Sequence, residues 1–250
     1  MPPDSSRWFD VHQSGTRSVS LFSIPHAGGS GYPYTAWRRR LPESVTVFGV
    51  RLPGRGPRIT ESPYRRMEPL ASALCDAMTE KLDGPFVMFG HSMGALIAFE
   101  VCSRLQQRGF SASHLIVSGA HPPHRPRGEK QLHLLPRNEF LQAIKNYRGI
   151  AAEIFEEEEL VSMFVPILRA DFELVETYPV RSHPPVACPI TAFGGEQDHA
   201  VNADWLQEWS RYTSSSFRRQ MFPGGHFFIS THEKEVLSAV NDMTEGIPAK

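Results

Sequence analysis

Cysteine is scarce in this sequence, and its positions form no recognisable site. The three cysteines, Cys75, Cys102 and Cys188, are odd in number and widely spaced, and none lies in a CxxC or mixed Cys/His pattern. Such spacing argues against a disulfide framework and against a metal centre. We predict three reduced thiols that are mostly buried, and no metal site.

The sequence also lacks a long apolar run. A membrane-spanning helix needs about 18 or more consecutive apolar residues, and no window of this chain comes close. The start, MPPDSSRWFDVHQSG, has neither the basic end nor the apolar stretch of a signal peptide. We therefore expect a cytoplasmic protein that does not associate with membranes.

No excess of charge of either sign is present overall. The formal net charge is −1 and the isoelectric point is about 6.8, which argues against nucleic acid as a partner. The distribution is uneven, however. Residues 1–66 carry ten Lys/Arg against four Asp/Glu, a net +6, and the remainder carries sixteen against twenty-three, a net −7.

What the chain does have is the length and apolar content for one large core. Its 250 residues are 40% apolar and 21% charged, which fits a single domain over residues 1–250. Strands are expected at 19–24, 45–50, 86–89, 115–117, 190–193 and 217–222, and helices at 34–41, 67–82, 94–108, 204–209 and 233–243. Most strand runs are continuously apolar, as in strands covered on both faces. This alternation predicts an α/β fold with a mostly parallel, doubly wound sheet.

Residues 128–182 interrupt the alternation, because they show helical periodicity and no strand. The apolar residues recur at spacings of three or four: Leu160, Phe164, Leu168, Phe172 and Val175. An insertion after a strand lies over the carboxyl edge of the sheet, where open α/β folds bind ligands. We interpret 128–182 as a helical lid; the alternative is that these helices belong to the ordinary helical layer.

The sequence GHSMG places Ser92 between Gly90 and Gly94, after the strand-like PFVMF and before the helix-like ALIAFEVCSRL. The motif alone is short enough to occur by chance, so this context is what makes it informative. A strand that enters a helix through Gly-x-Ser-x-Gly turns sharply and projects its serine above the sheet edge. The context predicts a nucleophilic serine in an α/β-hydrolase fold.

A serine hydroxyl needs a base and a carboxylate that orients the base, and the expected chain order is serine, acid, histidine. His226 fits best among the eleven histidines, because FPGGHFFI puts it in a glycine loop after the last expected strand. For the acid we favour Asp198, in the loop after the preceding strand, over Glu196 in the same loop. Asp171 is a third candidate, with a charge on a helix surface as its simpler interpretation.

An oxyanion hole requires two N–H donors. The first is expected from Met93, at the start of the helix that follows Ser92. The second normally comes from the loop after an early strand, and LFSIPHAGGSG supplies a glycine-rich turn there. We favour the N–H of Ala27, with that of Gly28 as the next choice.

Five segments together resemble the type II thioesterases that accompany polyketide synthases and nonribosomal peptide synthetases. They are HAGGSGYPYTAW, RLPGRGPR, GHSMGALIAFE, RADFELVETY and FPGGHFF. The resemblance extends from about Leu21 to Ile229, except for parts of the lid. It implies a cofactor-independent enzyme that removes stalled or aberrant acyl groups from the phosphopantetheine arm of carrier proteins. It also implies a triad of Ser92, Asp198 and His226, and an oxyanion hole at Ala27 and Met93.

Two further hypotheses concern the partner and the substrate. The basic cluster, with Arg38, Arg39, Arg40, Arg65 and Arg66, could steer an acidic carrier protein, or these arginines could simply be solvated. Phe164, Leu168 and Phe172 could line an acyl channel, or the same stripe could be lid core. A free-standing carboxylesterase or lipase and a noncatalytic binding protein remain as rival functions, and a monomer is the expected state.

Overall fold

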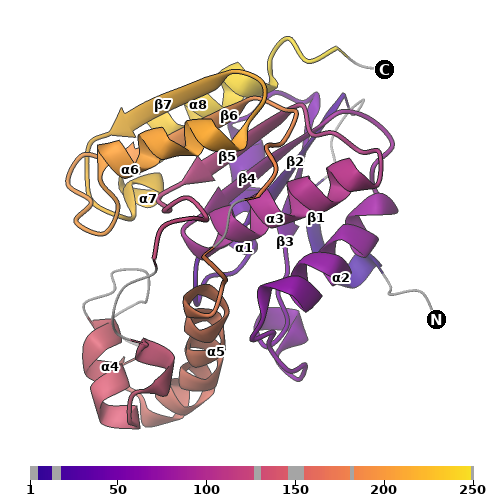
Figure 1. Cartoon of the computed structure of the whole chain (residues 1–250). Coiled ribbons are helices and arrows are strands. Elements are labelled where there is room, and N and C mark those ends of the chain that lie inside the picture. Colours follow the sequence, from indigo (N-terminus) through magenta and orange to yellow (C-terminus); the bar gives the residue numbers. More distant parts are fainter. Residues whose placement is uncertain (1–4, 13–17, 127–130, 146–154, 181–182, 249–250) are drawn as a thin grey trace.

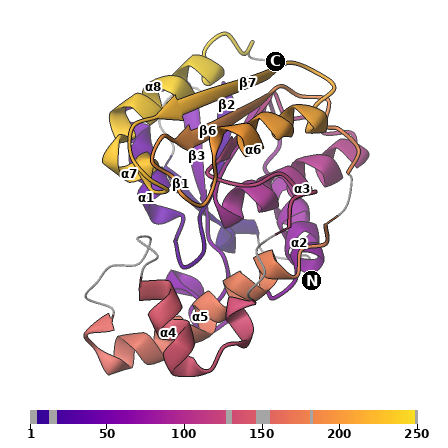
Figure 2. The same ribbon diagram turned by 60° about the vertical axis from the view of Figure 1, so that its left-hand side comes forward.

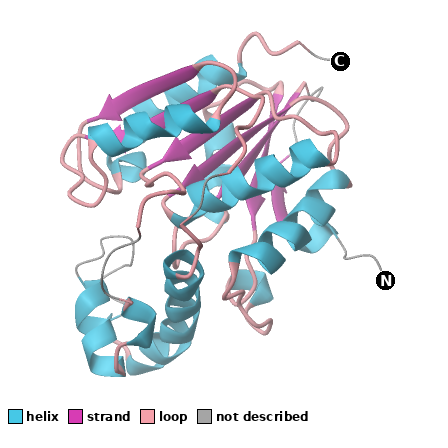
Figure 3. Ribbon diagram, viewed as in Figure 1, coloured by secondary structure: helices cyan, strands magenta, loops and turns pink. Residues whose placement is uncertain are grey.

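The computed structural model describes residues 5–12, 18–126, 131–145, 155–180 and 183–248. Seven strands form one sheet in the order β1-β3-β2-β4-β5-β6-β7 (Figures 1 and 3). The strands are β1 (Phe9–His12), β2 (Val19–Ile24), β3 (Val45–Val50), β4 (Phe86–His91), β5 (His114–Ser118), β6 (Ile190–Gly195) and β7 (Phe217–Phe222). Only β1 is antiparallel to its neighbour. The expected α/β fold with a mostly parallel sheet is confirmed.

Helices cover both faces of the sheet. The helices of the described chain are α1 (Tyr32–Thr35), α2 (Met67–Thr79), α3 (Met93–Gln107), α4 (Arg137–Lys145), α5 (Glu158–Glu176), α6 (Ala203–Gln207), α7 (Phe228–Thr231) and α8 (Glu233–Thr244), of which α4 and α5 belong to the insertion between β5 and β6. The expected helix 34–41 is split into α1 and a 3-10 turn, Ala36–Arg39. Strand β1 and helix α7 were not expected, and each is only four residues long.

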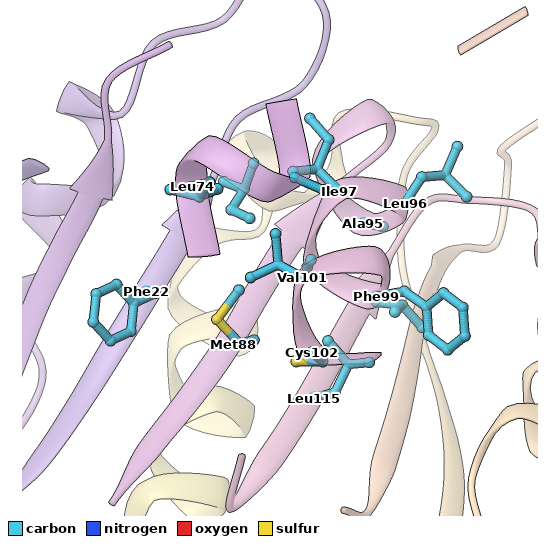
Figure 4. Close-up of a cluster of buried hydrophobic side chains, with 14 of the residues drawn as sticks. Phe22, Leu74, Met88, Ala95, Leu96, Ile97, Phe99, Val101, Cys102 and Leu115 are labelled. Atoms are coloured by element: carbon cyan, nitrogen blue, oxygen red, sulfur yellow. The ribbon is translucent and has the colours of Figure 1, made fainter. Parts of the chain in front are cut away.

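Alternating side chains of each central strand feed two separate apolar clusters. In β4, Phe86 and Met88 face the cluster under α2 and α3, whereas Val87 and Phe89 face the cluster under α8. Figure 4 shows side chains of α3 packed between the strands and α2. Because α3 is buried along most of its length, its first turn is fixed firmly relative to the end of β4.

The insertion between β5 and β6 forms its own helical unit. It contains a 3-10 turn, Leu132–Leu134, followed by α4 and α5, and its buried side chains make a third apolar cluster that includes Phe140, Val165 and Leu168. Figures 1 and 2 both show α4 and α5 set apart from the sheet. No helix within the described ranges has the length and apolar character needed to cross a membrane.

Candidate active site

Ser92 occupies a strained turn between β4 and α3. Its φ is 55°, the only positive φ of a non-glycine residue in the described part of the chain, and such a conformation is uncommon for a residue with a side chain. The two glycines make the turn possible by close approach. A Cβ on Gly90 would lie 2.1 Å from the carbonyl oxygen of Gly94, and one on Gly94 would lie 2.2 Å from that of Ile24. The structure therefore has the geometry of a nucleophile elbow.

His226 and Asp198 meet across two loops. Nδ1 of His226 lies 2.7 Å from Oδ2 of Asp198, and Oδ1 accepts the N–H groups of Ala200 (2.8 Å) and Val201 (3.3 Å). Burial by itself raises the pKa of Asp198, but the hydrogen bond and charge of His226 and the two N–H groups outweigh it, so the pKa lies below its ordinary value. Asp198 is thus held as a carboxylate against the imidazole.

One cavity of about 730 Å³ brings these groups together. Ser92, Asp198 and His226 all line it, together with Met93. Glu196, the rival acid from the same loop as Asp198, is exposed and is not among the lining residues. The cavity lies where the chain leaves the carboxyl ends of β4, β5, β6 and β7, as expected for a site in an open α/β sheet.

The two oxyanion candidates after β2 differ in what their N–H groups do. The N–H of Gly28 donates to Oδ2 of Asp171 at 2.8 Å, so it is already engaged. The N–H of Ala27 donates to no acceptor among the described residues. Met93 is the first residue of α3, where an N–H has no partner inside the helix. Met93 lines the cavity, whereas Ala27 is buried beside it and is not among the lining residues, so the pairing of Ala27 with Met93 stays a prediction.

The family model for the thioesterase domain matches residues 19–244 of this chain. The chain belongs to the thioesterase family. It is 37% identical over 245 residues to linear gramicidin dehydrogenase LgrE of Brevibacillus parabrevis, covering 96% of this chain and 93% of that protein.

Two solved structures are also similar to this thioesterase. The type II thioesterase BorB from the borrelidin biosynthetic cluster has a TM-score of 0.85 at 33% identity, with 94% of this chain and 97% of that one covered. The RedJ thioesterase from the prodiginine pathway of Streptomyces coelicolor has a TM-score of 0.85 at 35% identity, with 97% and 93% covered. The resemblance to type II thioesterases is confirmed, and with it a hydrolase that acts on acyl thioesters through the family's Ser-His-Asp chemistry.

The lid residues proposed for an acyl channel lie elsewhere in this thioesterase. Leu168 is buried in the insertion's own cluster, and Phe164 and Phe172 pack against that cluster. None of the three lines the cavity around Ser92, whereas Val175, one turn farther along α5 than Phe172, does. The helical periodicity predicted the apolar stripe from Leu160 to Val175, but it could not tell which end of that stripe reaches the cavity around Ser92.

Two functional-site neighbours were missed or misread from the sequence. His91, directly before Ser92, is fully buried, and its Nδ1 lies 2.9 Å from Oγ of Ser118. Burial, followed by the charges of His226 and His26, lowers the pKa of His91 well below 6.5, so it adds no positive charge beside His226. Asp171, read as a helix-surface charge, is instead buried in a bidentate ion pair with Arg55. A partner 116 residues away leaves no local signal in a sequence.

Proposed function

We propose that this thioesterase removes acyl groups from the phosphopantetheine arm of carrier proteins, with Ser92 as nucleophile, His226 as base and Asp198 as the acid that orients His226. One observation carries the proposal: Ser92 in its strained turn and the hydrogen-bonded Asp198–His226 pair line the same cavity. If Ser92, Asp198 and His226 faced different cavities, the proposed mechanism would have no structural basis.

In the first half of the reaction, Oγ of Ser92 attacks the thioester carbonyl carbon and its proton passes to Nε2 of His226. The carbonyl oxygen becomes an oxyanion that accepts the N–H groups of Ala27 and Met93. Collapse of this intermediate breaks the C–S bond and leaves the acyl group on Ser92. The thiolate takes the proton from His226, and because a thiol has a pKa of about 8.5 it leaves readily.

In the second half, His226 removes a proton from water, and the resulting nucleophile attacks the acyl-serine ester. The same two N–H groups stabilise the second oxyanion. Breakage of the ester bond releases the carboxylic acid, and His226 returns the proton to Ser92. The proposed chemistry needs only side chains, backbone N–H groups and water.

The assignment of carrier proteins as partners is supported by the relatives. BorB is a type II thioesterase from a biosynthetic cluster, and RedJ belongs to a biosynthetic pathway. The unpaired, buried thiols of Cys75, Cys102 and Cys188 support action in the reducing cytoplasm. We keep a monomer as the proposed active unit.

Charged side chains suggest how an acidic carrier would be steered. Arg40 pairs with Glu233, and Arg65 and Arg66 pair with Glu173, yet all three arginine side chains remain about half exposed. Glu233 and Glu173 offset part of this positive charge, so the proposed steering depends on the positive excess that remains over residues 1–66. Raising the salt concentration should lower kcat/KM for carrier-bound acyl groups and spare a free thioester; equal effects on both would exclude steering.

The test of the proposed function is intact-mass measurement on several acylated carrier proteins incubated with wild type and with Ser92→Ala. Wild type should restore the free carrier mass, and Ser92→Ala should leave the acyl group in place. Acyl-CoA and simple esters complete the panel. Fast ester turnover without thioester activity would replace the proposal with a carboxylesterase, and failure of a fluorophosphonate to label Ser92 would indicate a noncatalytic protein.

A further inference from the structure

Residues 26–29 form a tight turn that fixes the direction of the Ala27 N–H. The N–H of Gly29 donates to the carbonyl oxygen of His26 at 3.0 Å, and Gly28 has a φ of +76°, as in a type II turn. The peptide between His26 and Ala27 is trans. In a trans peptide the C=O and N–H point in opposite directions, so the Ala27 N–H is directed away from the turn.

A buried ion pair holds two further peptide groups of this turn, Ala27–Gly28 and Gly29–Ser30. Oδ2 of Asp171 accepts the N–H of Gly28 at 2.8 Å, and Nη1 of Arg55 donates to the carbonyl oxygen of Gly29 at 3.2 Å. Arg55 and Asp171 also bind each other through two hydrogen bonds of 2.7 and 2.8 Å. Their side chains are 8% and 3% exposed. A planar guanidinium fork and a carboxylate in this arrangement are held in one geometry.

The helical insertion contributes the carboxylate of this ion pair. Asp171 lies on α5, in the same half of the helix as the cavity-lining Val175. Arg55, Asp171 and Met93 also line one small void of about 10 Å³. The ion pair therefore lies beside the helix start that supplies the second oxyanion donor, as well as against the turn that supplies the first.

We propose that Asp171, paired with Arg55, is a positioning residue that aligns the Ala27 N–H for oxyanion binding and so couples the seating of α5 to catalysis. The inference rests on the proposed function of Ala27 as an oxyanion donor. When α5 is seated, Asp171 holds the Gly28 N–H and the turn keeps its shape. When α5 is displaced, the Gly28 N–H and the Arg55 guanidinium both lose the Asp171 carboxylate, and the turn is free to change conformation.

The test compares Asp171→Ala and Asp171→Asn with a matched control, Glu173→Gln. Glu173 is also on α5 and pairs with Arg65 and Arg66, but within the described part of the chain no hydrogen bond or ion pair joins its side chain to residues 26–29. Turnover is measured on a free acyl-pantetheine thioester, so that carrier docking does not contribute. Asp171→Ala should lower kcat about 10- to 100-fold, a fraction of what loss of a complete oxyanion donor costs. KM should change by less than about threefold.

Asp171→Asn should fall between wild type and Asp171→Ala, since its amide oxygen can still accept from Gly28 but no longer pairs with the Arg55 charge. Glu173→Gln should retain wild-type kcat. Because an unpaired buried Arg55 destabilises the fold, the double variant Arg55→Met/Asp171→Leu removes both charges and should show the same loss of kcat. End-point labelling of Ser92 by a fluorophosphonate counts the folded sites in every variant.

The initial rate of that labelling separates failure of this inference from failure of the proposed function. Attack of Ser92 on phosphorus displaces fluoride and places an oxygen in the oxyanion hole, whatever the natural substrate is. A slower rate in Asp171→Ala than in Glu173→Gln supports the positioning role even if wild type hydrolyses no thioester. Equal kcat per labelled site in Asp171→Ala and wild type, or equal losses in Asp171→Ala and Glu173→Gln, would overturn it.

Discussion

At the scale of single residues, the sequence offers two neighbouring candidates for the acid of the triad, Asp198 and Glu196. Asp198→Asn should lower kcat on the order of 10⁴-fold, because an amide opposite Nδ1 favours the wrong imidazole tautomer. Glu196→Gln changes the same charge in the same loop and should leave kcat essentially unchanged, since Glu196 is exposed and does not line the cavity. Steady-state kinetics of both variants on an acyl thioester show which of the two residues is the acid of the triad. A large loss in Glu196→Gln with a small one in Asp198→Asn would reverse the assignment.

The glycines of the elbow give a second prediction at this scale. Gly94→Ala would place a Cβ 2.2 Å from the carbonyl oxygen of Ile24, and backbone atoms in a buried element cannot move aside cheaply. We expect a loss of at least about 2 kcal/mol in the free energy of unfolding, measured by urea denaturation. Gly84→Ala is the control, because a Cβ there meets nothing within 4 Å, and it should unfold like wild type.

The elbow and the Asp198–His226 pair were accessible from the sequence because each depends on a short motif at the end of a strand. The Asp171–Arg55 pair was not, because neither residue has a local feature that marks it as buried. Residue spacing predicts which side chains share a face of one helix. It does not predict which distant loop that face will contact.

At the scale of elements, six of the seven strands were predicted. Strands β2 to β6 are mostly apolar runs in the buried part of the sheet, whereas β7, FRRQMF, is a partly exposed edge strand. Strand β1, with sequence FDVH, is short and lies at the sheet edge, and its Val11 is 43% exposed. Four residues with one charged member carry too little pattern to distinguish an edge strand from a loop. The helical insertion was predicted from its periodicity, but periodicity does not report that Asp171 of α5 pairs with Arg55.

The end of α5 gives the prediction that belongs to this scale. Val175 lines the cavity, whereas Phe172 packs in the insertion's own cluster, where its ring lies 5.9 Å from that of Phe140. Val175→Phe should reduce kcat/KM for long acyl chains about tenfold relative to short ones, because the larger ring occupies cavity volume. Phe172→Ala should lower the thermal stability and keep the chain-length preference. Acyl-pantetheine thioesters of graded length measure the chain-length preference of both variants. A preference that changes in Phe172→Ala and not in Val175→Phe would mean that the acyl chain runs along the lid stripe.

At the scale of the whole molecule, the free energy of unfolding depends on pH through groups whose protonation differs between the folded and the unfolded chain. Burial lowers the pKa of His114, at the start of β5, to about 4, and burial also keeps the pKa of His91 well below 6.5. In the unfolded chain both imidazoles titrate near 6.5. Between pH 6.5 and 4 the unfolded state therefore binds more protons than the folded state, and stability falls as the pH falls through this range.

Replacing His114 isolates part of this effect. Each such histidine contributes a slope of up to about 1.4 kcal/mol per pH unit, and His114→Gln removes one titrating group while keeping a side chain that can hydrogen-bond Thr191, the partner of His114 at 2.8 Å. Urea unfolding at pH 7.5, 6.5, 5.5 and 4.5 should show a shallower loss of stability in His114→Gln than in wild type below pH 6.5. Parallel curves would mean that the folded protein protonates His114 as readily as the unfolded chain does, in which case its burial in the sheet is too loose to exclude water. A residual slope in the variant is expected from His91, which lies beside the site and unfolds with the same core.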